Sequence, residues 1–418
     1  CTSDYTTNEI ENTNNNILEN AYQEIITQKT TPQALKVTKG NAKKIYVHYM
    51  PWFFTPEEDG YWGQHWTMTN RNPEIMDAQG KRQIASHYYP LIGPYSSNDN
   101  DLQEYHLLLM KLAGIDGVIF DWYGSRDVYD YRALKKSTES FIKEIEEVGL
   151  DFAIMYEDKV AKNTQTQRIP TANLNAAITD LQYIEKTYFK SPNYLRMNKS
   201  ELLFIFGPDY INDSLDWVDI MAKLKTNPTF MSLWKDRNNL GKYAGGEFSW
   251  IDKNHLNTLE GYYNYTKENN IQTVGGIYPC FNDYYTEGGW RNDTNADWQI
   301  APNGTQTLEA TLNLSNQYPV DFIQIITWND FGEGTMIEPT LEFGYTFLEK
   351  VQEYTQVSYT KKDLELPYKL YQLRKKHKND LKLQKILDRV YQCIFTLKLN
   401  QAEKIIRTIN LDYNTTIS

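Results

Sequence analysis

Residues 116–124 read DGVIFDWYG, a short apolar run that ends in an acidic residue, two aromatic residues and a glycine. Residues 150–158, LDFAIMYED, form a second apolar run that ends in one aromatic and two acidic residues, and it follows an amphipathic stretch, LKKSTESFIKEIEEVG (134–149). Such runs are continuously apolar rather than alternating, which is typical of a parallel strand whose sheet is covered on both faces. The three stretches together therefore predict one strand–helix–strand unit of a parallel sheet.

Six further apolar runs lie on either side of this unit, with amphipathic stretches such as 102–114, 215–225 and 255–270 between them. These runs are 44–53, 201–207, 229–234, 245–251, 273–281 and 321–330. Eight strands that alternate with helices favour a closed barrel over an open doubly wound sheet. No GxGxxG or GxxxxGK[ST] motif opens any of these helices, which weakens the nucleotide-binding alternative. We therefore expect an α/β fold of the (β/α)8 TIM barrel class.

The rest of the chain divides around this barrel. We expect a tether and a helix over 1–41, the barrel over 42–357, and a helical appendage over 358–418, where Lys-rich stretches carry regularly spaced Leu, Ile and Tyr. The first connection of the barrel, from about Thr55 to Asn100, is unusually long. Its stretch IMDAQGKRQIASHYY (75–89) has a helix-like pattern. The Trp and His content of the whole connection predicts a wall of the site rather than a disordered loop.

Charge and composition narrow the classes of partner. The chain has 54 acidic and 43 basic residues and a net charge of −11, which argues against a nucleic-acid partner. Its 32 Tyr and 10 Trp favour contact with sugars, because these side chains combine a flat apolar face with a polar tip. No apolar run approaches the roughly 18 residues that a membrane-spanning helix needs. We expect a monomer that acts on a polysaccharide or oligosaccharide.

Three cysteines are present, Cys1, Cys280 and Cys393. Whether Cys280 and Cys393 pair is left open, because the sequence does not show the distance between them. No CxxC or HExxH motif is present, so we expect no metal site and no cofactor. Cys1 and the polar stretch after it resemble a mature bacterial lipoprotein, although an arbitrary boundary is the alternative. We therefore expect lipidation at Cys1 and attachment to the outer membrane, at the cell surface or on the periplasmic side.

Candidate catalytic residues follow from the fold, because TIM-barrel enzymes place them at the carboxyl ends of the strands. Asp330 and Glu333 follow the last run, and Gly332 and Gly334 permit a tight turn around them. Glycoside hydrolysis needs two carboxyl groups, one protonated and one ionised. Two solvated turn carboxylates are the alternative, but aromatic and polar residues at the other strand ends favour catalysis. Those residues are His48, Tyr49, Trp52, Asp121, Trp122, Tyr123, Tyr156, Glu157, Asp158, Trp250, Asp252, Tyr278, Asn282, Asp283, Trp328 and Asn329.

Five motifs resemble glycoside hydrolase family 99, which holds endo-acting α-mannosidases and α-mannanases. They are HYMPWF (48–53), GQHW (63–66), FDWYG (120–124), MYED (155–158) and WNDFGEGTMIEP (328–339), and the resemblance covers about residues 42–350. It implies that Asp330 acts as a base on the sugar 2-hydroxyl to give a 1,2-anhydro intermediate. It also implies that Glu333 acts as general acid and then base. It places Glu157 on a carboxylate of the site, and it places Tyr49, Trp122 and Asn329 in the pocket lining.

The last motif also departs from the family pattern, which reads approximately WNEWHEGTxIEP. Asp330 replaces a Glu and shortens its reach by one methylene, and Phe331-Gly332 replaces Trp-His. In this part the segment is closer to glycoside hydrolase family 71, fungal α-1,3-glucanases. The resemblance therefore spans families 99 and 71, and the sugar is left open.

Two functions stay open at this point. The first is an endo-acting glycoside hydrolase on an α-mannan or α-glucan, and the second is a non-catalytic glycan-binding lipoprotein on the same barrel. For the first we expect Asp330 and Glu333 to be catalytic. We expect substrate contacts from Glu157, Tyr49, Trp52, His65, Trp66, Trp122, Tyr156, Asn329 and Tyr278. At least one of Trp52, Trp66 and Trp122 should form a sugar platform, unless each fills core space.

Overall fold

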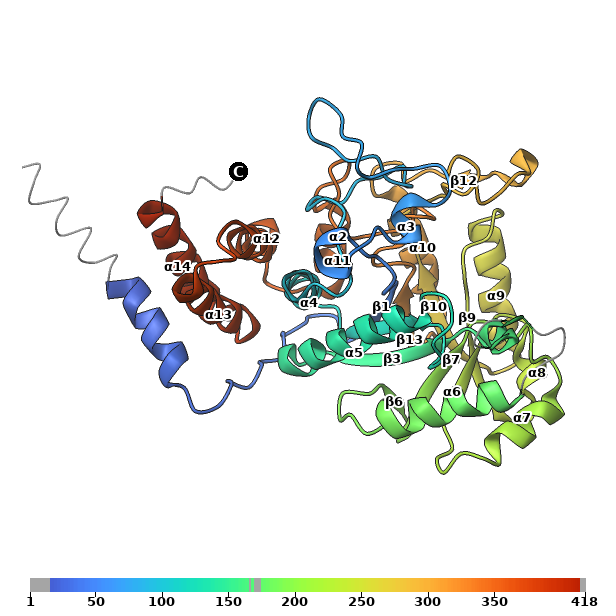
Figure 1. Cartoon of the computed structure of the whole chain (residues 1–418). Coiled ribbons are helices and arrows are strands. Elements are labelled where there is room, and N and C mark those ends of the chain that lie inside the picture. The colour runs from blue at the N-terminus through green and yellow to red at the C-terminus, as the bar shows by residue number, and fades with distance from the viewer. Residues whose placement is uncertain (1–15, 165–166, 169–173, 414–418) are drawn as a thin grey trace, which may run out of the picture.

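A computed structural model describes residues 16–164, 167–168 and 174–413. Eight parallel strands in it close into one barrel, because β1 pairs with both β2 and β13 while β3 pairs with β7 (Figure 1). The strands are β1 (Ile45–Tyr49), β2 (Gly117–Trp122), β3 (Asp151–Tyr156), β7 (Ser200–Ile205), β8 (Thr229–Leu233), β9 (Ala244–Phe248), β10 (Gln272–Ile277) and β13 (Phe322–Ile325). Each overlaps one of the eight predicted runs, so the predicted (β/α)8 barrel is confirmed.

Helices surround the barrel and cover its outer face (Figure 1). They are α4 (Asn100–Leu112), α5 (Tyr131–Val148), α6 (Leu174–Thr187), α7 (Ser214–Met221), α8 (Arg237–Leu240), α9 (Leu256–Glu268), α10 (Gln306–Ser315) and α11 (Thr346–Thr355). Helix α5 shows why these stretches are helical. Its buried residues Leu134, Phe141, Ile145 and Val148 recur at helical spacing on one face, and Gly149 ends the helix with a positive φ of 78°.

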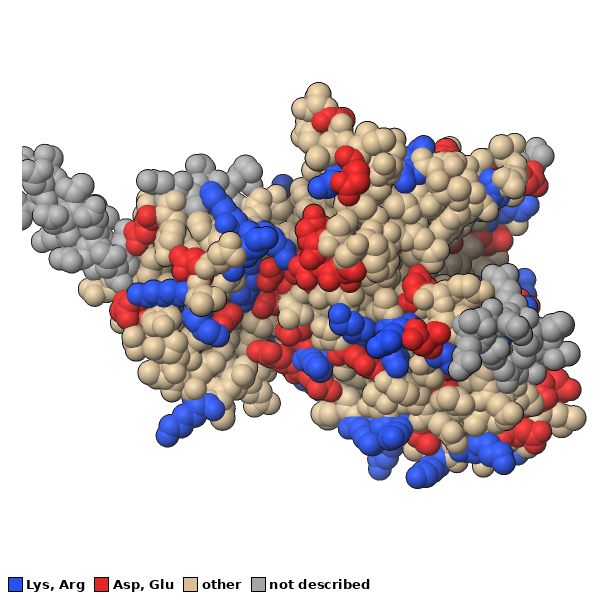
Figure 2. All heavy atoms as spheres, in the orientation of Figure 1, with Lys and Arg blue, Asp and Glu red and all other residues tan. Residues whose placement is uncertain are grey.

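Three C-terminal helices follow the barrel where the sequence predicted Lys-rich helices, and the first two of them pack against α4. They are α12 (Lys361–Lys376), α13 (Leu381–Phe395) and α14 (Leu399–Asp412), and residues 16–27 form a further helix. Figure 2 shows basic side chains on these helices next to acidic side chains on the barrel side. Buried Arg374 lies 2.6 Å from Glu104 of α4, and Lys375 lies 2.6 Å from Asp99 at the N-terminus of that helix. Charge pairing therefore attaches this part of the chain to the barrel.

The long first connection contains only two short helices, α2 (Pro56–Asp59) and α3 (Gln64–Thr67). The helix predicted over 75–89 is absent, and that prediction was wrong. Asp77 instead closes a turn, because its carboxylate accepts hydrogen bonds from the N–H groups of Gln79 and Lys81 at 2.9 Å. Gly80 has a φ of 80°, so the chain reverses there. The apolar spacing of this stretch imitates a helix but belongs to a loop.

The remaining short elements lie in loops: η1 (Asp158–Lys162), β4 (Asn163–Thr164), β5 (Gln167–Arg168), β6 (Arg196–Met197), η2 (Gly241–Tyr243), β11 (Phe281–Asn282), η3 (Thr294–Ala296) and β12 (Gln299–Ile300). Cys280 and Cys393 are both buried and free, so they do not pair. Cys1 lies outside the described residues, and its lipidation stays a prediction. Within the described ranges, no helix is both long and apolar enough to cross a membrane.

Candidate active site

The loop after β13 holds Asp330 and Glu333 at the carboxyl end of the barrel. The N–H of Asp330 donates to Oγ1 of Thr327 at 2.8 Å, and the N–H of Glu333 donates back to Oδ1 of Asp330 at 2.9 Å. Gly334 has a φ of 65°, and a Cβ there would lie 2.7 Å from the carbonyl oxygen of Asn282. This position therefore requires glycine, and the tight loop brings the two acidic residues together.

The two carboxyl groups have different surroundings. Burial raises the pKa of Asp330 to about 7, although the N–H groups of Gly332 and Glu333 oppose the shift by bonding the ionised form. Burial and the charge of Asp330 raise the pKa of Glu333 to about 8, while a hydrogen bond from Tyr285 opposes that shift. Among the described residues, Oε2 of Glu333 has no hydrogen-bond partner. Main-chain N–H groups thus favour the ionised form of Asp330, whereas the charge of Asp330 favours the protonated form of Glu333.

A second acidic pair lies at the ends of β2 and β3. Burial raises the pKa of Asp121 well above its ordinary range, and the charges of Glu157 and Asp330 raise it further. Burial also raises the pKa of Glu157, and Lys159 opposes this with its Nζ 2.5 Å from Oε2. Since the pKa of Asp121 responds to carboxylates that follow β3 and β13, the predicted convergence of acidic residues in one mouth is present. The sequence interpretation did not include Lys159, which lies three residues beyond the end of β3.

Aromatic side chains form the rim beside Glu333. The Tyr285 hydroxyl donates to Oε1 of Glu333 at 3.0 Å. The Tyr285 ring lies 6.0 Å from Trp290 at an angle of 22°, and the Trp290 ring meets His65 edge-on at 5.4 Å. His65 in turn stacks on Trp52 at 3.8 Å, and burial lowers its pKa to about 3, so it is neutral. The structure thus brings Trp52 and His65 to the mouth, together with Tyr285 and Trp290, which the sequence interpretation missed.

Four of the expected substrate contacts point away from the mouth. The side chains of Tyr49, Trp122, Tyr156 and Tyr278 are buried between the strands and the helices. Their polar atoms bond to His106, Tyr188, Asp180 and His255, respectively. Successive residues of a strand face opposite sides, so Asp121 and Glu157 face the mouth while their neighbours Trp122 and Tyr156 face the helices. The structure therefore corrects these four expectations.

Trp66 and Asn329 also have structural positions. Trp66 is fully buried, and its Nε1 donates to the carbonyl oxygen of Tyr95 at 2.8 Å, so it fills core space rather than forming a platform. The side chain of Asn329 accepts from the N–H of Met50 at 2.8 Å and donates to its carbonyl oxygen at 3.0 Å. This double contact ties the loop after β13 to the end of β1. Asn329 therefore acts as a positioning residue, because it fixes the main chain next to Asp330.

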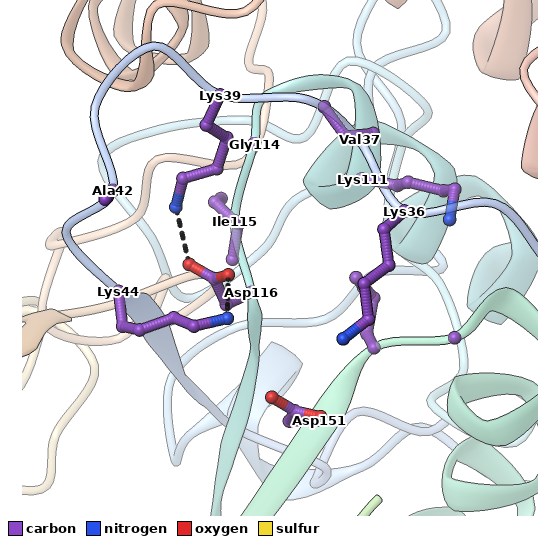
Figure 3. Close-up of a pocket in the computed structure, with 12 residues that line it drawn as sticks. Lys36, Val37, Lys39, Ala42, Lys44, Lys111, Gly114, Ile115, Asp116 and Asp151 are labelled. Atoms are coloured by element: carbon purple, nitrogen blue, oxygen red, sulfur yellow. Dashed lines mark hydrogen bonds and ion pairs between the residues drawn. The ribbon is translucent and has the colours of Figure 1, made fainter.

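The opposite rim of the barrel holds a separate pocket of about 220 Å³ (Figure 3). Lys39 and Lys44 both reach the carboxylate of Asp116, the residue before β2, at 2.6 and 2.7 Å. Buried Lys111 donates to the carbonyl oxygen of Val148 at 2.8 Å. Lys39 and Lys44 thus hold the segment before and at the start of the barrel to the residue before β2, and Lys111 joins α4 to the end of α5. In the described part of the chain, no group of three or more His, Cys, Asp or Glu could hold a metal ion.

Comparisons with known proteins show what the chain is similar to. Residues 41–234 match the model of glycosyl hydrolase family 99. A glycoprotein endo-alpha-1,2-mannosidase-like protein of Danio rerio is 24% identical over 328 residues, which are 70% of each chain. Glycoprotein endo-alpha-1,2-mannosidase of Rattus norvegicus is 23% identical over 331 residues, covering 70% of this chain and 67% of the relative.

The fold has a counterpart among solved structures. The GH99 endo-alpha-mannosidase of Bacteroides thetaiotaomicron superimposes with a TM-score of 0.59 at 18% identity, over 75% of this chain and 96% of that one. Its barrel agrees with the closed sheet described above. The family match and the relatives confirm the resemblance seen in the sequence, and the chain is a glycoside hydrolase similar to family 99.

Proposed function

We propose that the chain cleaves an α-linked glycan at internal bonds, with α-mannan as its substrate class and Asp330 and Glu333 as the reacting pair. The observation that carries this proposal is the unequal environment of the two carboxyl groups. Asp330 accepts main-chain N–H groups that favour its charge, whereas Glu333 retains an oxygen without a hydrogen-bond partner among the described residues. One acid and one base in the same mouth are what glycoside hydrolysis requires.

In this proposal Glu333 gives its proton to the leaving oxygen as the bond between that oxygen and the anomeric carbon breaks. The leaving sugar departs as an alcohol, and Glu333, now ionised, takes a proton from the water that attacks the anomeric carbon. Asp330 either stabilises the positive charge that develops on the ring or takes the proton of the sugar 2-hydroxyl. In the second case O2 bonds to the anomeric carbon as the leaving group departs, and Asp330 returns the proton to O2 when water opens that bond. Both roles need an ionised group, which its main-chain hydrogen bonds favour.

The second acidic pair supports the binding of the sugar rather than the transfer of protons. Buried Asp121 has a raised pKa. In its protonated form it can donate a hydrogen bond to a sugar hydroxyl group and accept one from another. Glu157 is held by Lys159 and stays available as an acceptor. The choice of α-mannan rests on the endo-alpha-mannosidase relatives, and the barrel mouth itself favours no sugar over another.

Turnover of defined glycans tests this function. The full chain is incubated with a reducing-end-labelled α-mannan oligosaccharide and, separately, with an α-1,3-glucan oligosaccharide, and the fragments are separated by length. We expect internal fragments of the mannan to appear first. Release of single sugars only would contradict internal cleavage. Cleavage of the glucan alone would show that the substrate class is an α-glucan and not an α-mannan.

Asp330 in place of the family's Glu is the one feature that favours the alternative, a glycan-binding protein without activity. The same incubation therefore includes Asp330→Glu. If the wild-type chain binds the oligosaccharide but cleaves nothing while Asp330→Glu cleaves it, the shortened side chain has removed the activity. If the wild-type chain cleaves, the alternative is excluded.

A further inference from the structure

Trp290 is a large aromatic residue that stays exposed beside the reacting pair. Its side chain keeps 41% of its surface accessible, although Trp side chains are usually well buried. Its main chain is nevertheless fixed, because its N–H donates to the carbonyl oxygen of Tyr285 at 2.8 Å. The next residue, Arg291, forms ion pairs with Asp283 at 2.9 Å and Asp297 at 3.1 Å. The ring is therefore held at the surface by its loop.

Ring contacts place Trp290 close to the proposed acid. Tyr285 bonds Glu333 through its hydroxyl and lies nearly parallel to the Trp290 ring at 6.0 Å. On its other side Trp290 meets the edge of His65, which stacks on Trp52. Trp290 is thus one aromatic ring away from the side chain of Glu333 and continues the rim outward.

The mouth has two unlike sides around the pair. Asp121, Glu157 and Lys159 form a charged group at the ends of β2 and β3, where Asp330 contributes to the raised pKa of Asp121 and Lys159 opposes the raised pKa of Glu333. Tyr285 and Trp290 lie on the side of Glu333. A general acid must reach the oxygen of the leaving group, so residues beside the acid border the leaving sugar.

We propose that Trp290 is the platform on which the leaving-group sugar stacks, through the C–H face of a pyranose ring. The inference rests on the proposed function, because it uses Glu333 as the acid. Trp290 gives a flat apolar face one aromatic ring beyond Glu333, and a bound sugar covers the surface that the free chain leaves exposed. Trp290 is a binding residue, and it takes no part in proton transfer.

The test compares two substrates that differ only in their leaving group. An α-mannotetraose has sugars on both sides of the cleaved bond, whereas an α-mannobiosyl fluoride has fluoride in place of the leaving sugar. Trp290→Ala should raise KM for the tetraose about tenfold and leave KM for the fluoride within twofold. Trp290→Phe should recover most of the loss because it restores a flat ring. Tyr265→Ala is the matched control, since Tyr265 is 39% exposed on α9 and has no place in the rim.

Equal losses on both substrates would overturn the inference, because they would show that Trp290 supports the whole site. An unchanged KM for the tetraose would overturn it as well. If the wild-type chain cleaves neither substrate, the proposed function fails separately, and the platform is tested by calorimetric binding of the tetraose. Weaker binding in Trp290→Ala, with Tyr265→Ala unchanged, then supports the platform, and equal binding in all three refutes it.

Discussion

Replacing Tyr285 by Phe tests how the protonation of Glu333 is set. The substitution removes the hydroxyl that donates to Oε1 of Glu333 at 3.0 Å and keeps the ring beside Trp290. That hydrogen bond favours the ionised carboxylate, so its loss raises the pKa of Glu333 above about 8. A hydrogen bond to a charged group contributes roughly 1.5–3 kcal/mol, and one pKa unit corresponds to about 1.36 kcal/mol. Because solvent partly reaches Glu333, we expect the lower end, a rise of about one unit.

The assay is the pH dependence of kcat/KM on an α-mannan oligosaccharide. A general acid must be protonated to act, so the alkaline limb of the profile reports the loss of its proton. In Tyr285→Phe this limb should move about one unit upward. The matched control is Tyr123→Phe, which removes a hydroxyl that bonds Asp121 instead and should leave the limb in place. A limb in Tyr285→Phe that stays fixed or moves downward would refute the assignment of Glu333 as the acid.

Three further predictions concern the stability of the chain. Glu333→Gln should raise Tm, and by more at pH 9 than at pH 5, in thermal unfolding scans. The raised pKa means that the wild-type fold loses stability as pH rises from 4.5 to about 8, and the amide has no charge to bury. Tyr156→Phe should lower the free energy of unfolding by about 1–3 kcal/mol, because buried Asp180 loses a hydrogen bond at 2.9 Å, while kcat in the glycan assay stays unchanged. Arg374→Leu should cost about 3–5 kcal/mol in urea unfolding, because it leaves Glu104 without its partner, and KM should not change.

The strands were predictable because their physical signal is local. Residues 117–122 and 151–156 are almost entirely buried, as continuously apolar parallel strands under helices must be. The loop over 75–89 was not predictable in this way. Its apolar spacing resembles that of a helix, but Gly80 and the turn at Asp77 determine its conformation. A turn of this kind depends on a few side-chain hydrogen bonds rather than on a repeating pattern.

The sequence predicts at which strand ends the site residues lie, but it predicts only partly which way their side chains face. Asp330 and Glu333 follow a strand end, so the topology of the barrel alone brings them to the mouth. Trp122 and Tyr156 lie at strand ends too, yet they face the helices. Both faces of a barrel strand are apolar, so the sequence has no polar alternation from which the inward side could be inferred.

Residues in the loop after β11 were missed for a different reason. Tyr285 and Trp290 reach Glu333 and His65 only through the folding of a long loop, and sequence distance does not predict such contacts. The signal that could have found them is composition. The loop holds three Tyr or Trp residues within seven positions, directly after the acidic Asp283.

The most direct test of the central claim is the turnover of an α-mannan oligosaccharide by Glu333→Gln, with Asp121→Asn as the matched carboxylate control. Removing a general acid typically costs about 10²- to 10⁴-fold in rate. Glu333→Gln should therefore lose at least about a hundredfold in kcat while it still binds the glycan, and Asp121→Asn should lose less. A loss below tenfold in Glu333→Gln, or a larger loss in Asp121→Asn, would contradict the account and assign the acid to another carboxylate of the mouth.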